Sequence, residues 1–191
     1  KTRTNISRDF VELPSQIMEN WCRHPEVMKM YAKHYETGEA IPDEIIKKIE
    51  NAGTYGQGFV NAELIAASLL DFKYHIITNP TKITLPEFED KAMASIGLIP
   101  EIISRYKSTY FQHIFSGGYS CGYYSYTWAA VLDNDAFEAF RENGIFDTVT
   151  ADAFRYNVLE LGNTKDPMEL YVNFRTKQPS ITPLLRNRGL L

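Results

Sequence analysis

The clearest chemical pattern in the sequence is a run of aromatic residues around a pair of glycines, between residues 113 and 126. Gly117 and Gly118 allow a tight backbone turn before a helix. Three phenols recur at steps of four and three, which would place them on one helical face: Tyr119, Tyr123 and Tyr126. A phenol can donate a hydrogen bond to a developing oxyanion, and His113 upstream could donate as well or shuttle a proton. The pattern fits a reactive site, and it also fits an aromatic core stripe whose hydroxyls bond to the backbone.

Glu12 is a second candidate, because it is a carboxylate inside an otherwise apolar helical segment at residues 10–14. Burial of a carboxylate is costly unless the group is paired or bound to a metal. Asp9 and Glu19 lie near it on the same side of the helix, so periodicity alone favours a solvated acidic surface over a metal ligand. A further acidic face, which we also expect to be solvated, is formed by Asp133, Asp135 and Glu138.

Composition and missing motifs exclude several classes of function. The net charge of −4 argues against a dedicated nucleic-acid binder, and no apolar run approaches the roughly 20 residues that span a bilayer. The sequence contains no H-E-x-x-H, no histidine pair at i, i+4, no phosphate-binding Gly-Lys-Ser/Thr loop and no Gly-x-Ser-x-Gly elbow. Two cysteines, Cys22 and Cys121, are too few for a disulfide framework, and we expect both to be reduced and buried.

The elements that must position these side chains are helices. Apolar spacing and the placement of Pro and Gly predict helices at 9–22, 25–35, 42–53, 59–76, 86–96, 122–142, 150–162 and 166–174, with a short helical turn in 178–191. Pro14 either lies in the first turn of its helix or bends it. The segment 107–121 is less regular, and only 111–115 could form a strand. With no repeat and no linker-like tract, residues 1–191 are expected to form a single helical domain.

Several separate motifs, in order along nearly the whole chain, resemble the thimet oligopeptidase and peptidyl-dipeptidase family of zinc metallopeptidases. They are Asp-Phe-Val-Glu-Leu-Pro-Ser-Gln at 9–16 with Glu-Asn-Trp at 19–21, His-Tyr-Glu-Thr-Gly-Glu-Ala-Ile-Pro at 34–42, and the segment 113–128. Asp-Pro-Met at 166–168, Asn-Phe-Arg at 173–175 and Leu-Leu-Arg at 184–186 resemble the bacterial peptidyl-dipeptidase branch in particular.

The resemblance implies an all-α, zincin-like fold with two halves and a deep cleft. In that family zinc is held by two histidines of an H-E-x-x-H helix and by a later glutamate, which corresponds here to Glu12. Two imidazoles and one carboxylate leave a coordination position open for water, and the glutamate of H-E-x-x-H serves as general base. The resemblance further implies that His113, Tyr119 and Tyr126 hold the peptide and stabilise the oxyanion. Tyr123 matches a further family tyrosine with a less defined role. Gly117 and Gly118 would allow the loop to hinge over the bound peptide.

The absence of H-E-x-x-H is the main departure from the family pattern. We expect that motif just upstream of Lys1, so that residues 1–191 are the C-terminal portion of the catalytic region. Alone, this portion is expected to be inactive, to bind little or no zinc, and to self-associate. With its missing N-terminal part the protein is expected to act on short peptides and to release C-terminal dipeptides. Internal cleavage of oligopeptides and a non-catalytic helical interaction module are the alternatives. The expected compartment is the cytoplasm, with the periplasm not excluded.

Overall fold

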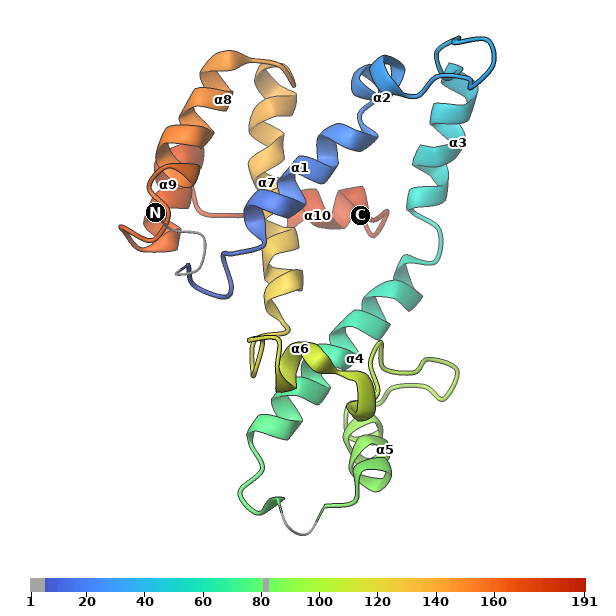
Figure 1. The fold of residues 1–191 in the computed structure, drawn as a ribbon, viewed down its shortest axis with the longest axis vertical. Helices are drawn as coiled ribbons and strands as arrows, with labels where there is room; N and C mark the ends of the chain where they lie inside the picture. Colours follow the sequence, from blue (N-terminus) through green and yellow to red (C-terminus); the bar gives the residue numbers. More distant parts are fainter. Residues whose placement is uncertain (1–5, 81–82) are drawn as a thin grey trace. The chain divides into compact units, whose positions relative to one another are not determined.

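The computed structural model describes residues 6–80 and 83–191, and within those ranges it is all-α, as the sequence predicts. Figure 1 shows the helices, and an isolated bridge between Lys33 and Ala40 is the sole β pairing in the described ranges. The helices are α1 (Leu13–Arg23), α2 (Pro25–Tyr31), α3 (Asp43–Gly53), α4 (Gln57–His75), α5 (Leu85–Ser95), α6 (Gln112–Phe115), α7 (Ser125–Asn143), α8 (Thr148–Phe154), α9 (Pro167–Arg175) and α10 (Thr182–Asn187), with a 3₁₀ turn η2 (Ser108–Tyr110) and a π-helical turn η3 (Arg155–Leu159). None of these helices is long and apolar enough to cross a membrane.

Helix starts agree with the proline signals in the sequence. Pro14 lies in the first turn of α1, where its missing N–H costs nothing, and α2 and α9 also begin at a proline. The suggested strand at 111–115 is wrong. Residues 112–115 form the single helical turn α6, whose Gln112 carbonyl accepts the N–H groups of Ser116 and Gly117. The expectation of buried cysteines is also wrong, since both thiols are free and exposed.

The chain separates into two compact units. Residues 1–55 and 129–191 form the first unit, and residues 56–128 form the second. Helix α7 begins in the second unit and ends in the first. The expectation of a single domain over 1–191 stays a prediction.

The core of the first unit is built on aromatic side chains from α1, α7 and α9. The indole of Trp21 packs edge-on against Phe137 and Phe140, with ring centroids 4.7 and 4.6 Å apart. Its Nε1–H donates to the carbonyl of Ile145 at 2.8 Å, so burying the indole leaves its polar atom satisfied. Phe174 of α9 packs against Phe140 from 6.2 Å.

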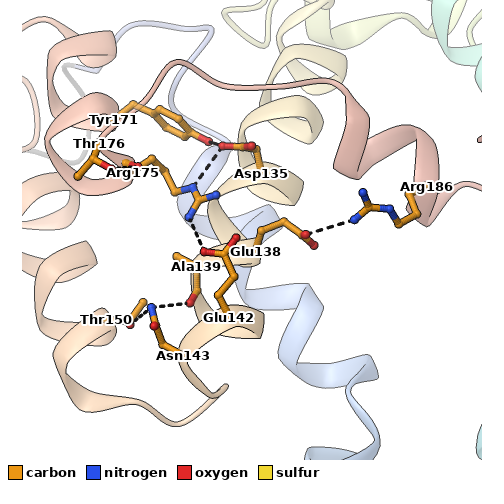
Figure 2. Close-up of polar contacts among 10 residues, drawn as sticks. All are labelled: Asp135, Glu138, Ala139, Glu142, Asn143, Thr150, Tyr171, Arg175, Thr176 and Arg186. Carbon is orange, nitrogen blue, oxygen red and sulfur yellow. Dashed lines mark hydrogen bonds and ion pairs between the residues drawn. The ribbon is translucent and has the colours of Figure 1, made fainter.

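A buried charge network joins α9 to α7 in this unit (Figure 2). Tyr171 Oη donates to Asp135 Oδ2 at 2.6 Å, and Arg175 Nε donates to the same oxygen at 3.3 Å. Asp135 and Arg175 are 1% and 6% exposed, so their charges compensate one another in a dry environment. Burial and the bond to Asp135 raise the pKa of Tyr171 above its usual range. Nearer the surface, Glu138 pairs with Arg186.

Asp133 is also buried, so the prediction of a solvated acidic face was wrong for Asp133 and Asp135. Asp133 accepts from Asn20 Nδ2 at 3.2 Å and from Asn134 Nδ2 at 2.9 Å. Burial raises the pKa of this carboxyl to about 7, although the bond from Asn20 acts in the opposite direction. The spacing of acids along α7 is typical of a solvated face, but the turns of α7 that carry Asp133 and Asp135 are buried.

The second unit is built around the long helix α4, which packs against α5. Its core consists of Ala67, Leu70, Ala92, Phe111, Ile114 and Tyr123. The buried carboxylate of Glu89 on α5 accepts from both the backbone N–H and the hydroxyl of Ser108. Burial alone would raise the pKa of Glu89, but the two Ser108 bonds and Lys107 together hold it below its usual range. This contact ties the irregular segment before α6 to α5.

Candidate active site

The second unit gathers the predicted aromatic residues into one cluster. His113 is on α6, Tyr119 lies in the following turn, Tyr123 precedes α7, and Tyr126 is in its first turn. The imidazole of His113 lies 5.9, 5.5 and 6.1 Å, centroid to centroid, from the three phenol rings in that order. The structure therefore brings the imidazole and the three phenols together within one unit.

Tyr119 and Tyr126 form the stacked pair in this arrangement. Their rings stack with centroids 5.1 Å apart and planes inclined by 16°. Tyr119 lies before α7, so the two rings do not share a helical face as the spacing suggested. The turn carries Tyr119 back toward α7, and its N–H donates to the carbonyl of His113 at 2.9 Å. Both phenols and the imidazole are half-buried, so each keeps some accessible surface.

The glycine pair is required by this turn. A Cβ on Gly117 would lie 2.8 Å from the Cα of His113, closer than carbon atoms approach in folded proteins. Gly118 has φ 80°, in the left-handed region that side chains disfavour. Both glycines are exposed, which places the turn at the surface beside the tyrosines.

Tyr123 is the buried member of the cluster, at 3% exposure. Its ring lies 5.1 Å from that of Tyr126 and 5.8 Å from that of Tyr106. Burial raises the pKa of Tyr123 well above its usual range, and Tyr106 reinforces this, while Arg105 acts in the opposite direction. Its ring thus belongs to the core of the unit, and the half-buried Tyr126 packs against it.

Two neighbours of the cluster are not found by the sequence reasoning. Tyr106 stacks on Phe111 with centroids 4.8 Å apart and lies 5.0 Å from the imidazole of His113. Arg105 is electrostatically coupled to both phenols: Tyr106 raises the pKa of Arg105, and Arg105 acts to lower the pKa of Tyr123. Both precede the glycine turn in an irregular segment, where no periodic spacing marks them.

Asp71 of α4 is a further missed residue, and it contacts the backbone of the tyrosine loop. Its Oδ1 accepts the N–H of Cys121 and its Oδ2 accepts the N–H of Tyr123, both at 2.9 Å. His75 Nδ1 lies 2.9 Å from Oδ1. The residue is 1% exposed. The available signal was a single acid inside the apolar run Leu70-Asp71-Phe72, which is improbable for a buried helix face unless the acid has partners.

Glu12 lies immediately before α1, in the first unit, whereas the aromatic cluster lies in the second. The carboxylate is half-buried, and the Ser15 hydroxyl is shared between its Oε2, at 3.1 Å, and the main-chain carbonyl of Glu12, at 2.9 Å. A half-buried carboxylate oriented by a hydroxyl suits one position of a zinc ligand set. In the described part of the chain, however, no three His, Cys, Asp or Glu side chains come together as a metal site. Glu12 thus fits as one ligand, and the described residues do not complete the set.

Comparisons with known proteins agree with the motifs. The profile of Peptidase family M3 matches residues 1–190. The dipeptidyl carboxypeptidase of Escherichia coli (strain K12) is 42% identical over 189 residues, which cover 98% of this chain and 28% of the relative. The oligopeptidase A of Salmonella typhimurium is 40% identical over 190 residues, with the same two shares, and a probable cytosolic oligopeptidase A of Arabidopsis thaliana is 41% identical over 192 residues. The chain therefore spans little more than a quarter of the length of these relatives. Because the family profile matches nearly all of its residues, the chain belongs to Peptidase family M3.

Proposed function

We propose that these residues are part of a zinc-dependent peptidase that hydrolyses short peptides and releases dipeptides from their C-termini. The proposal is supported by membership of family M3 and by the similarity to two dipeptidyl carboxypeptidases, at 42% and 40% identity. The observation that carries it is the grouping of His113, Tyr119 and Tyr126 with ring centroids 5.1 to 6.1 Å apart. Such a group offers hydrogen-bond donors side by side, as acyl transfer requires.

In this proposal Tyr126 and His113 are catalytic residues. Each donates a hydrogen bond to the oxygen that becomes negative when the peptide carbonyl is attacked. The stacking of Tyr119 on Tyr126 restricts rotation of both rings, so their hydroxyls are oriented before the substrate arrives. Tyr119 also holds the peptide backbone, and Tyr123 contributes to the substrate site from its buried position by supporting the ring of Tyr126.

Gly117 and Gly118 belong to the substrate site in this proposal through the backbone rather than through side chains. At both positions a Cβ is disfavoured, by the contact with His113 at Gly117 and by the positive φ at Gly118. The turn they form lets a peptide approach the main chain closely and gives the loop a hinge.

Glu12 is the proposed zinc ligand of this chain. When bound, zinc would supply a Lewis acid that polarises the scissile carbonyl and activates water. The Ser15 hydroxyl would keep the Glu12 carboxylate oriented toward the metal. Two histidine ligands and the general base are proposed to come from residues outside this chain, because the sequence has no H-E-x-x-H.

Residues 1–191 alone are accordingly proposed to be inactive and to bind zinc weakly. The partner that completes the site is the remainder of the same protein, since the chain spans 28% of its dipeptidyl carboxypeptidase relatives. Exposed apolar side chains on α4, at Phe59, Ile65 and Phe72, support the further proposal that the isolated chain self-associates. The proposed compartment is the cytoplasm, with the periplasm as the alternative; two free thiols are typical of a reducing compartment.

Internal cleavage of oligopeptides is the second candidate activity. It is favoured by the oligopeptidase A relatives, whose identities of 40% and 41% nearly equal those of the dipeptidyl carboxypeptidases. The two activities differ in one requirement. Release of a C-terminal dipeptide depends on recognition of a free terminal carboxylate two residues beyond the cleaved bond, whereas internal cleavage does not.

The test uses the full-length protein and two N-blocked tetrapeptides that differ only in a free or an amidated C-terminus. Mass spectrometry of the products, with and without a chelator and after zinc is restored, reports both the bond that is cut and the need for metal. We expect cleavage of the free acid two residues from its end, strong loss for the amide, and loss with chelator that zinc reverses. Equal cleavage of the two peptides would support the internal activity, and activity indifferent to chelator would refute the zinc mechanism.

A further inference from the structure

The turn that carries the tyrosines is held in an unusual backbone conformation. Cys121 has φ 53°, one of two positive values at non-glycine residues in the described ranges. A left-handed conformation at a residue with a Cβ persists only where surrounding contacts enforce it. Two such contacts come from α6, since His113 O accepts the Tyr119 N–H and Ile114 O accepts the Ser120 hydroxyl at 2.6 Å.

The enforcing contacts on the other side of the turn come from a single side chain. Both carboxylate oxygens of Asp71 are used, one by the N–H of Cys121 and one by the N–H of Tyr123. These two N–H groups flank Gly122 and point in one direction because Cys121 is left-handed. A two-oxygen acceptor matches this pair, whereas an amide side chain offers one acceptor and would face the second N–H with its own donor.

We propose that Asp71 is a positioning residue of the active site: by accepting the N–H groups of Cys121 and Tyr123, it fixes the turn that sets Tyr119 against Tyr126. This inference rests on the proposed function of the two tyrosines. Asp71 itself lies in the core of the second unit, 1% exposed, and acts through the loop backbone. A comparable buried carboxylate, Glu89, holds Ser108 and makes no contact with the turn, so it provides a matched control.

The test compares Asp71→Asn with Glu89→Gln in the full-length zinc-loaded protein, each alone and combined with Tyr126→Phe. A displacement of about 1 Å at a catalytic group lowers the rate by about 100-fold. We therefore expect Asp71→Asn to lower kcat by roughly 10- to 100-fold with KM changed by less than about threefold. In the Tyr126→Phe background its effect on kcat should shrink to about threefold or less, because the phenol through which it acts is already absent.

Glu89→Gln should act independently of Tyr126, so that its effect on kcat is the same in both backgrounds. If Asp71 had only a structural role, the effect of Asp71→Asn on kcat would also be the same in both backgrounds, and zinc or folded protein would be lost as well. Full retention of the Asp71→Asn effect in the Tyr126→Phe background, or an unchanged kcat, would overturn the proposal.

A second measurement needs no variant and no activity. Hydrogen exchange of the wild-type protein, resolved to residues 119–124 by mass spectrometry, reports whether the amides of Cys121 and Tyr123 are held. We expect both to exchange at least about 100-fold more slowly than in an unstructured peptide. Exchange at the unstructured rate would refute the role of Asp71 even if Asp71→Asn fails to fold. An inactive wild-type protein with slowly exchanging amides would instead refute the proposed function, while supporting the hydrogen bonds from the loop amides to Asp71.

Discussion

Asp133 allows a prediction of how stability depends on pH. The carboxyl is 5% exposed and receives hydrogen bonds from the amides of Asn20 and Asn134. Its pKa is about 7 in the folded chain, against 3.8 ordinarily, chiefly because burial disfavours the charged form and secondarily because Glu19 lies nearby; Asn20 and Arg188 act in the opposite direction. The folded state therefore holds this proton over a pH range in which the unfolded state has released it.

The sign and size of the effect follow from this difference. A raised carboxyl pKa contributes stability that is fully present below the unfolded pKa and is lost as pH rises through the folded value. At about 1.4 kcal/mol for each pKa unit, the loss between pH 4 and pH 7.5 amounts to about 4 kcal/mol at most. Asp133→Asn removes the titration but keeps an oxygen that can accept from Asn20. The variant should match the wild-type protein near pH 4 and exceed it by up to this amount at pH 7.5.

The assay is urea unfolding of the 191-residue chain, monitored by circular dichroism of its helices at half-unit steps from pH 4 to 8. Asp152→Asn is the matched control, because it makes the same chemical change at an exposed position and should leave the pH profile parallel to that of the wild type. An advantage of Asp133→Asn that does not grow with pH, or a variant less stable than wild type at pH 7.5, would show that Asp133 is not held protonated in the folded chain below pH 7 and refute the reasoning.

Four further substitutions test the site and the core. Tyr126→Phe in the full-length protein should lower kcat by roughly 10²–10³-fold, since one oxyanion donor is lost, whereas Tyr55→Phe at an 88% exposed position should change nothing in the same assay. Glu12→Gln should weaken zinc binding first, measured by metal content after dialysis, with activity restored by excess zinc. Arg175→Met leaves Asp135 without its cation and should lower the free energy of unfolding by about 3–5 kcal/mol, measured in urea. Gly117→Ala should disturb the turn and lower kcat because its Cβ meets His113, whereas Gly53→Ala, with no atom within 4 Å, should leave kcat unchanged.

Helices were predictable from the sequence because their signals are local. Prolines at 14, 25 and 167 mark helix starts in the first turn, and the apolar spacing along 59–76 anticipates α4 within a residue or two. Burial was less predictable. Asp133 and Asp135 have the spacing of a solvated face, but their partners Asn20 and Arg175 are 113 and 40 residues away in sequence, so no local pattern reveals them.

The candidate site was predictable in its residue types but not in its construction. The spacing of Tyr119 and Tyr126 suggested one helical face, yet their stacking arises from the glycine turn that precedes α7. Asp71 lies 50 residues before Cys121, and its partners are backbone N–H groups that no residue type reveals, so only its place in an apolar run distinguishes it in the sequence. The roles assigned to Glu12, His113 and the tyrosines come from the family resemblance, and they stay predictions until the substitutions above are made.

Each of the two units contains one of the two tryptophans of the chain. Trp21 belongs to the first unit, and Trp128 is the last residue of the second. Each unit therefore carries its own intrinsic fluorophore, and replacing one indole by phenylalanine leaves the emission of the other tryptophan alone. In each single-tryptophan protein, an emission melting curve that superimposes on the circular-dichroism curve would show that the two units lose structure in one cooperative event, and a displaced curve would show that one of them opens first.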